Sequence, residues 1–179
     1  YTNEEFETMK LDVTLMLENG ADGIAFGCLT SESEIDVKQT KEIVDIIKSF
    51  NKEGVFHRAF DCVKDVDKAM NILIELGVDR VLTSGLMPKA MDGIEMIKYL
   101  QDKYGDRIEI LAGSGMNASN AKEMMEKTGI CQVHSSCKGW RNDSTTSGKF
   151  VNYCYVGEPH QNDYDVVDEE LVRNIVNSI

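Results

Sequence analysis

Residues 55–61, with the sequence VFHRAFD, hold the side chains best suited to chemistry, because an apolar run ends there in His57, Arg58 and Asp61. Imidazole transfers protons or binds metals, and a guanidinium pairs with carboxylates and phosphates. Two further apolar runs end in polar residues in the same way, at residues 80–85 (RVLTSG) and 131–136 (CQVHSS). Since parallel strands present their carboxyl ends at one edge of a sheet, we expect one shared site.

The elements that position these residues follow a repeated pattern. Apolar spacing predicts helices over residues 2–19, 36–50, 64–76, 90–103 and 118–127, and Thr2 with Glu5 forms a capping box for the first. Strands are predicted over residues 24–28, 55–60, 80–83, 108–112 and 131–134. This alternation indicates βαβ units and a parallel sheet in an α/β protein. Five strands can build an open doubly wound sheet, whereas a closed barrel needs eight strands.

The sequence changes character after His134. Residues 139–164 are rich in Ser, Thr, Asn, Asp and Gly and are predicted to form a long loop, of the kind that serves as a functional lid or is partly disordered. A closing helix is predicted over residues 168–179. We expect the whole chain, residues 1–179, to form a single domain.

Composition limits the class of protein. The 179 residues are 42% hydrophobic and carry a net charge of -12, which argues against nucleic acid and anionic membranes as partners. No segment has the length of a membrane-spanning helix, and no basic-then-apolar signal opens the chain, so a cytoplasmic location is expected. The five cysteines contain no C-x-x-C pair and are expected to be free thiols.

The motif series resembles the CutC copper homeostasis family. The motifs are VFHRAFD, then GVDRVLTSG at residues 77–85, AGSG at residues 112–115 and VHSS at residues 133–136. The resemblance implies an eight-stranded TIM barrel, of which this chain holds about five β/α units, the fourth to the eighth. An incomplete barrel has unpaired sheet edges, so we expect the chain to fold poorly alone or to form a homo-oligomer.

Strand alternation would place His57, Ala59 and Asp61 on one face, and would direct His134 inward as well. If the protein is an enzyme, His57, Asp61 and His134 are the candidate catalytic residues, acting as general acids or bases. The same groups could bind a metal, or they could only satisfy a polar barrel interior.

A glycine-rich turn follows the strand at residues 108–112. Gly113, Ser114 and Gly115 could present backbone N–H groups to an anion, and TIM barrels commonly bind phosphate near their last two strands. The alternative is a tight turn that needs glycine only for its backbone angles. The other candidate binding residues are polar residues at strand ends: Arg58, Thr83, Ser84, Ser135 and Ser136.

The resemblance implies copper binding. Since Cu(I) prefers soft ligands, the cysteine thiols are the residues to consider as its ligands. Cys28, Cys62 and Cys137 each follow a predicted strand and are the candidate metal ligands. Cys137 follows the last strand, so one ion reaches all three only if loops fold inward. The family's N-terminal strands also carry cysteines that resemble ligands, and those strands are not in this sequence.

Two functions therefore follow. The first is a cytosolic copper homeostasis protein that binds Cu(I) in copper tolerance or trafficking, and this is the assignment that the resemblance favours. The alternative is a TIM-barrel enzyme for a small anionic or phosphorylated metabolite, with His57 and His134 in proton transfer and Arg58 or Lys89 neutralising an acid group. Whether the protein is an enzyme is left open by the sequence.

Overall fold

The computed structural model describes residues 1–154 and 156–179. They divide into two compact units, and each is described by itself. Unit 1 comprises residues 1–116 and 123–134, and unit 2 comprises residues 117–122 and 135–179. None of the helices in the described residues combines the length and the apolar character that a membrane crossing needs.

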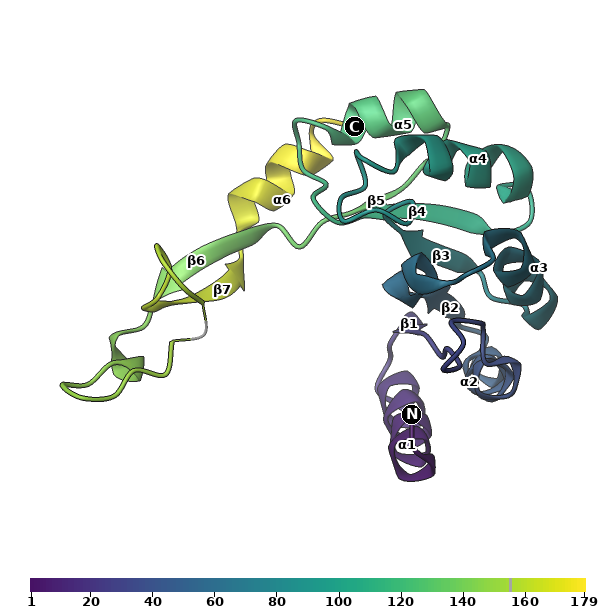
Figure 1. Ribbon diagram of the computed structural model, residues 1–179, viewed down its shortest axis with the longest axis horizontal. Coiled ribbons are helices and arrows are strands. Elements are labelled where there is room, and N and C mark those ends of the chain that lie inside the picture. The colour runs from purple at the N-terminus through teal and green to yellow at the C-terminus, as the bar shows by residue number, and fades with distance from the viewer. Residues whose placement is uncertain (155) are drawn as a thin grey trace. The chain divides into compact units, whose positions relative to one another are not determined.

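Unit 1 contains a parallel five-stranded sheet in the order β1-β2-β3-β4-β5 (Figure 1). Its strands are β1 (Gly23–Phe26), β2 (Glu53–Phe56), β3 (Arg80–Thr83), β4 (Glu109–Gly113) and β5 (Val133–His134). The helices that alternate with them are α1 (Asn3–Glu18), α2 (Val37–Ser49), α3 (Val66–Leu76), α4 (Ile94–Tyr104) and α5 (Ala121–Thr128), of which the first two residues of α5 are assigned to unit 2. Spatial order equals chain order, and the predicted α/β fold with five parallel strands is confirmed.

Local signals in the sequence explain where the helices begin. The predicted capping box is present at α1, where the Thr2 hydroxyl accepts from the Glu5 N–H and the Glu5 carboxylate accepts from the Thr2 N–H. Aspartate side chains cap the next two helices, Asp36 at α2 and Asp65 at α3.

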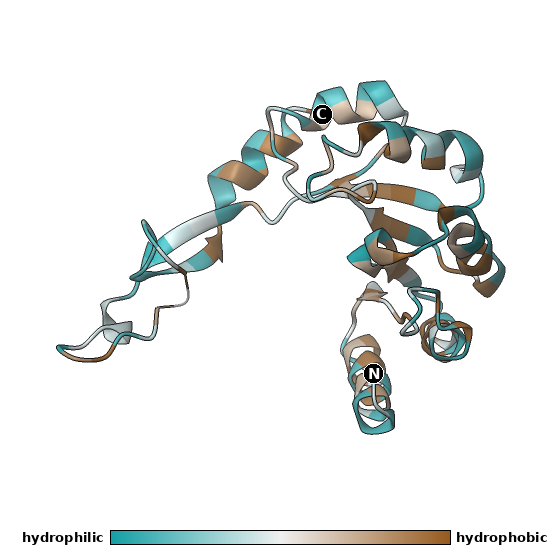
Figure 2. Ribbon diagram, in the orientation of Figure 1, coloured by the Kyte–Doolittle hydropathy of each residue, from teal (hydrophilic) through white to brown (hydrophobic). Residues whose placement is uncertain are grey.

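Alternate residues of the strands are buried and contribute to the core. Figure 2 shows hydrophobic residues along these strands. Phe26 and Phe56 meet on neighbouring strands in an edge-to-face contact, with ring centroids 5.8 Å apart. The opposite face carries polar groups: Arg80 Nε donates to Glu109 Oε2 at 2.6 Å, and Gln132 Nε2 donates to the same oxygen at 2.6 Å. Alternation along each strand thus separates an apolar face from a partly polar one.

The end of β2 differs from the prediction. The strand stops at Phe56, and the 3₁₀ helix η1 (Arg58–Cys62) follows, so the predicted strand over residues 55–60 was wrong in its second half. The reason is local, because the His57 side chain accepts a hydrogen bond from the Ala59 N–H and caps the 3₁₀ turn. The alternation argument therefore does not apply to Ala59 and Asp61.

Unit 2 contains the antiparallel strands β6 (Lys138–Asn142) and β7 (Asp163–Val167), the 3₁₀ helix η2 (Ser144–Thr146) and α6 (Glu169–Val176). The predicted loop over residues 139–164 is therefore wrong at both ends, while residue 155 lies outside the described residues. Gly139 and Asn142 disfavour strands by local propensity, and only pairing with a segment more than twenty residues away makes their segment extended. Trp140 stacks on His160 with ring centroids 4.1 Å apart.

Candidate functional site

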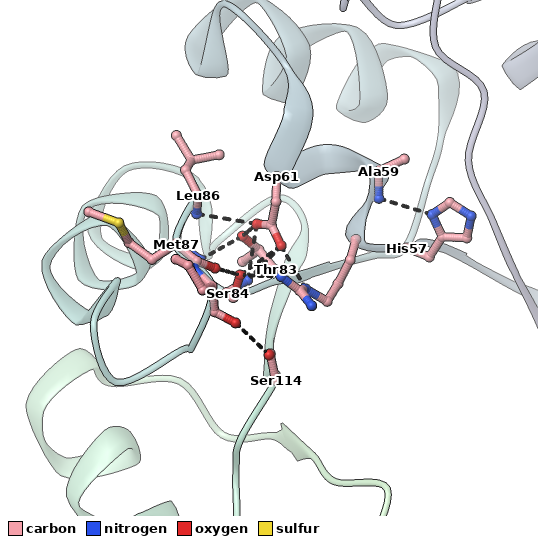
Figure 3. A network of polar contacts seen from close by, with 11 residues as sticks. His57, Ala59, Asp61, Thr83, Ser84, Leu86, Met87 and Ser114 are labelled. Atoms are coloured by element: carbon pink, nitrogen blue, oxygen red, sulfur yellow. Dashed lines mark hydrogen bonds and ion pairs between the residues drawn. The ribbon is translucent and has the colours of Figure 1, made fainter. Parts of the chain in front are cut away.

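The Asp61 carboxylate is the centre of a polar network at the carboxyl ends of β2 and β3 (Figure 3). Its side chain is only 8% exposed. Oδ1 accepts from the Thr83 hydroxyl at 2.5 Å and the Leu86 N–H at 3.3 Å, and Oδ2 accepts from the Ser84 hydroxyl at 2.8 Å. The Ser84 N–H reaches both oxygens, at 3.0 and 3.1 Å. These donors occupy the lone pairs of the carboxylate, so the arrangement suits Asp61 for positioning its neighbours.

Arg58 is anchored to this network by two of its nitrogens. Nε donates to Asp61 Oδ2 at 2.8 Å, and Nη2 donates to the Ser84 hydroxyl oxygen at 2.8 Å. The side chain nevertheless remains 42% exposed. A guanidinium has five N–H groups, so Arg58 retains donors for a ligand.

His57 lies directly after β2 and against β1. Its backbone N–H donates to the Phe26 carbonyl oxygen at 2.7 Å, and its ring lies so close to Gly27 that a Cβ there would be 2.5 Å from His57 Cε1. Nδ1 accepts from the Ala59 N–H at 3.1 Å, so in the neutral ring Nε2 carries the proton. Nε2 is thereby the nitrogen available for proton transfer.

The loop between β3 and α4 links this network to the end of β4. The single proton of the Ser84 hydroxyl is shared between Asp61 Oδ2 and the Met87 carbonyl oxygen, and the Ser114 hydroxyl donates to the Pro88 carbonyl oxygen at 2.7 Å. The Ala90 N–H donates to the Ser114 carbonyl oxygen at 3.0 Å. Asp61, Ser84 and Ser114, from three successive βα connections, therefore hold one loop.

Lys89 belongs to that loop, and its stem crosses the glycine-rich turn. A Cβ on Gly115 would lie 2.9 Å from Lys89 Cδ, so the stem packs directly against this glycine, whose φ is +79°. The backbone of Ser114 is left-handed, with φ +83°. The Lys89 stem thus lies against Gly115, and the residues on either side of Lys89 form hydrogen bonds with Ser114.

His134 is exposed and lies at the end of β5, where it pairs with Gly113. Strands are spaced by about 4.8 Å, so the backbones of β2 and β5, three positions apart in the sheet, are about 14 Å apart. At this strand spacing, His57 and His134 would act together on a ligand that spans the strands between them.

Three predicted residues follow β5 and belong to unit 2. The Ser135 hydroxyl accepts from the Cys137 N–H at 3.2 Å, and Ser136 is exposed. The roles of Ser135 and Ser136 in anion binding and of Cys137 in metal binding remain predictions.

The described residues contain no group of three or more His, Cys, Asp or Glu side chains arranged to hold a metal ion. Cys28 is fully buried, and burial, followed by the charge of Asp36, raises the pKa of its thiol to about 11. Burial and a raised pKa both disfavour the exposed thiolate form that binds metal ions readily. Cys62 is exposed at the end of η1.

The sequence reasoning missed the loop residues that connect the network, Leu86 and Pro88 in particular. Their segment lies between Gly85 and Gly93. A short stretch of mixed polar and apolar residues with a glycine at each end is typical of a compact turn. That signal could have identified the loop, but not its bonds to Asp61 and Ser114, which join residues far apart in the chain.

A parallel sheet with alternating helices, carrying its polar network at the carboxyl ends of the strands, defines an α/β protein of TIM-barrel-like type. The chain belongs to the CutC family, whose profile matches residues 1–139. A CutC family protein of Treponema denticola is 36% identical over 180 residues, covering 100% of this chain and 72% of that protein. One of Glaesserella parasuis is 35% identical with the same coverage.

Solved structures show the same fold. A CutC protein of Streptococcus agalactiae, provisionally named for copper homeostasis, superposes with a TM-score of 0.70 at 30% identity. The match covers 75% of this chain and 65% of that one, so this chain spans just under two thirds of it. A structure described as native KDPGal has a TM-score of 0.55 at 11% identity and covers 94% of this chain and 63% of that one, a likeness of fold alone.

Proposed function

We propose that the network at the carboxyl ends of β2, β3 and β4 binds a small anionic metabolite. The observation that carries this proposal is the state of Arg58, whose guanidinium is fixed by Asp61 and Ser84 and is still 42% exposed. A fixed and accessible guanidinium loses little conformational entropy when it binds an oxyanion. Its position at the strand ends is the usual place for ligands in barrels of parallel strands.

Lys89 supports the same proposal with a second positive charge. Its stem lies over Gly115, and its side chain is exposed. The network that anchors Arg58 also holds the Lys89 loop, through the Met87 and Pro88 carbonyl oxygens. Two cations on one hydrogen-bonded framework favour a ligand with more than one acidic group.

His57 provides proton chemistry for such a ligand. With Nδ1 held by the Ala59 N–H, the proton on Nε2 can be donated and recovered. We therefore propose an enzyme whose general acid or base is His57, with His134 acting at the far end of a ligand that reaches β5.

The test is thermal denaturation with a panel of small phosphates and di- or tricarboxylates, compared with uncharged analogues of equal size. Binding at 100 times Kd should raise Tm by about 5 °C. The Lys89→Gln variant should weaken the shift, while Lys98→Gln, an exposed lysine on α4 paired with Asp102, is the matched control. The absence of any shift across the panel would refute the proposal.

Copper handling is a second candidate, favoured by the provisional name of the Streptococcus agalactiae relative. In this proposal the protein binds Cu(I) as a cargo in the cytosol, for copper tolerance or trafficking. Cys62, whose thiol is exposed, would be the first ligand to bind the ion. Cys28 and Cys137 would join as ligands only if the chain rearranged, because both are buried. Soft thiolate ligands suit Cu(I).

Competition with a Cu(I) chelator tests this second candidate on the reduced protein. Cys62→Ser should lower the affinity more than tenfold, and Cys131→Ser, which also removes an exposed thiol, should leave it unchanged. Equal affinities for all three proteins would exclude Cys62 as a ligand.

Self-association is proposed as well. β1 and β5 are the edge strands of the sheet and each pairs with a single strand, so their outer backbone groups are open to pairing with another copy. Sedimentation velocity should show a dimer or larger species, and a monomer at all concentrations would contradict this.

A further inference from the structure

The two hydrogen bonds that anchor Arg58 occupy one edge of its guanidinium. Nε donates to Asp61 Oδ2, and Nη2 donates to the Ser84 hydroxyl oxygen, each at 2.8 Å. These two nitrogens form the side edge of the planar group. The other edge that can bind a ligand in a bidentate manner is formed by Nη1 and the second hydrogen of Nη2. It has no partner among the described residues.

Asp61 is held so that it does not compete for this free edge. Five donor groups fix the carboxylate: Arg58 Nε, the Thr83 and Ser84 hydroxyls, and the Ser84 and Leu86 backbone N–H groups. A carboxylate with its lone pairs occupied cannot turn to take both edges of the guanidinium. Its negative charge is also shared among these donors, which reduces its repulsion of a nearby anion.

We infer that an oxyanion of the ligand docks on the Nη1–Nη2 edge of Arg58 through two parallel hydrogen bonds, and that Asp61 is the positioning residue that keeps this edge free. The inference rests on the proposed anion-binding function and adds its geometry. The recognised group has two acceptor oxygens at the spacing that a carboxylate or a phosphate monoester provides. A lysine ammonium is a compact charge without a planar pair of donors, so it cannot reproduce this bidentate contact.

The experiment is a titration of ¹⁵N-labelled protein with malonate and, separately, with inorganic phosphate, following the Arg58 Nε–Hε signal by NMR. Malonamide, which has no charge, is the control ligand. Arg58→Lys keeps the positive charge but removes the planar pair of N–H donors, so it should weaken binding about tenfold or more. Arg107→Lys, at the amino-terminal side of β4, is the matched control and should bind as the wild type does. The stronger of the two ligands identifies the class of oxyanion.

Asp61→Asn tests the positioning role of Asp61. The measurement is hydrogen exchange at Arg58 alone, which a general loss of stability would not change selectively. Without the ion pair, the Arg58 Nε–Hε signal should exchange faster with solvent while other arginine signals stay unchanged, and anion affinity should fall several-fold. If this variant does not fold, Ser84→Ala replaces it with the same expected result. It removes the Nη2 anchor and the hydroxyl contacts to Asp61 and to the Met87 carbonyl oxygen.

The outcomes distinguish failure of the Arg58 contact from failure of the proposed anion-binding function. If the wild type binds an anion and Arg58→Lys binds it equally well, the edge contact is wrong although the proposed function stands. If the wild type binds neither malonate nor phosphate and no member of the wider panel shifts Tm, both fall. An unchanged Arg58 signal in both Asp61→Asn and Ser84→Ala would overturn the positioning role alone.

Discussion

The backbones of Gly85 and Gly93 are in contact, since a Cβ atom on Gly85 would lie 2.2 Å from the Gly93 carbonyl oxygen. The two glycines close the loop that carries Met87, Pro88 and Lys89, so the loop begins and ends at nearly the same point. Gly85 also has a left-handed backbone, with φ +69°. Both features require a residue without a side chain.

Gly85→Ala is therefore expected to be strongly destabilising. The new methyl group would have to push two backbone segments apart, and we expect a loss of about 3 kcal/mol or more in the free energy of unfolding, of which about 1 kcal/mol is the cost of the left-handed backbone. Gly77→Ala is the control, because Gly77 has φ +80° but no atom within 4 Å of its Cβ position. Urea denaturation should separate the two variants by about 2 kcal/mol, and equal losses would show that the close contact is unimportant.

Ser114 allows the loop anchor to be separated from backbone strain. Ser114→Ala removes the hydrogen bond to the Pro88 carbonyl oxygen and should cost about 1 kcal/mol. Ser114→Gly removes the same bond but relieves the strain at φ +83°, which returns about 1 kcal/mol. The glycine variant should thus be the more stable of the two in urea denaturation. An alanine variant as stable as the glycine variant would indicate that the left-handed backbone carries no strain.

The sequence could predict the elements of unit 1 because each helix and strand carries its own period. The apolar residues of α2 recur at helical spacing, and β4 is a short apolar run bounded by turns, so neither needs tertiary information. The cluster at residues 55–61 was also recognisable, because polar residues end an apolar run there. The pairing of Asp61 with Ser84 and Leu86 was not, because it depends on η1 replacing the end of the strand and on a loop more than twenty residues away.

Asp67 should make the stability of unit 1 depend on pH in the acid range. Hydrogen bonds from Tyr104, Lys103 and Tyr99 lower the pKa of its carboxyl group from about 3.8 to about 2. A carboxyl group whose pKa is lower in the folded state stabilises the fold above its unfolded pKa, and that stabilisation is lost as pH falls through the folded pKa. The loss should therefore occur between about pH 4 and about pH 2.

Asp67→Asn should remove this part of the pH dependence, and Tyr104→Phe should remove the largest share of it, because the Tyr104 hydroxyl is the foremost cause of the lowered pKa. The group is partly exposed, so the effect will be modest and salt-sensitive. The measurement is the free energy of unfolding in urea at several values of pH from 2 to 6. A wild-type profile that matches that of Asp67→Asn throughout this range would contradict the role of Asp67.

The thiols should divide into a reactive and a protected group. Cys62, Cys131 and Cys154 are exposed, whereas Cys28 and Cys137 are buried. Alkylation requires an accessible thiolate, and the pKa of about 11 at Cys28 leaves almost none at pH 8. Iodoacetamide at pH 8 should label the three exposed thiols of the native protein, and mass spectrometry of peptides should find Cys28 and Cys137 labelled only after unfolding in urea. If Cys28 were labelled as fast as Cys62, its burial would be transient, and its thiol would be accessible to Cu(I) together with that of Cys62.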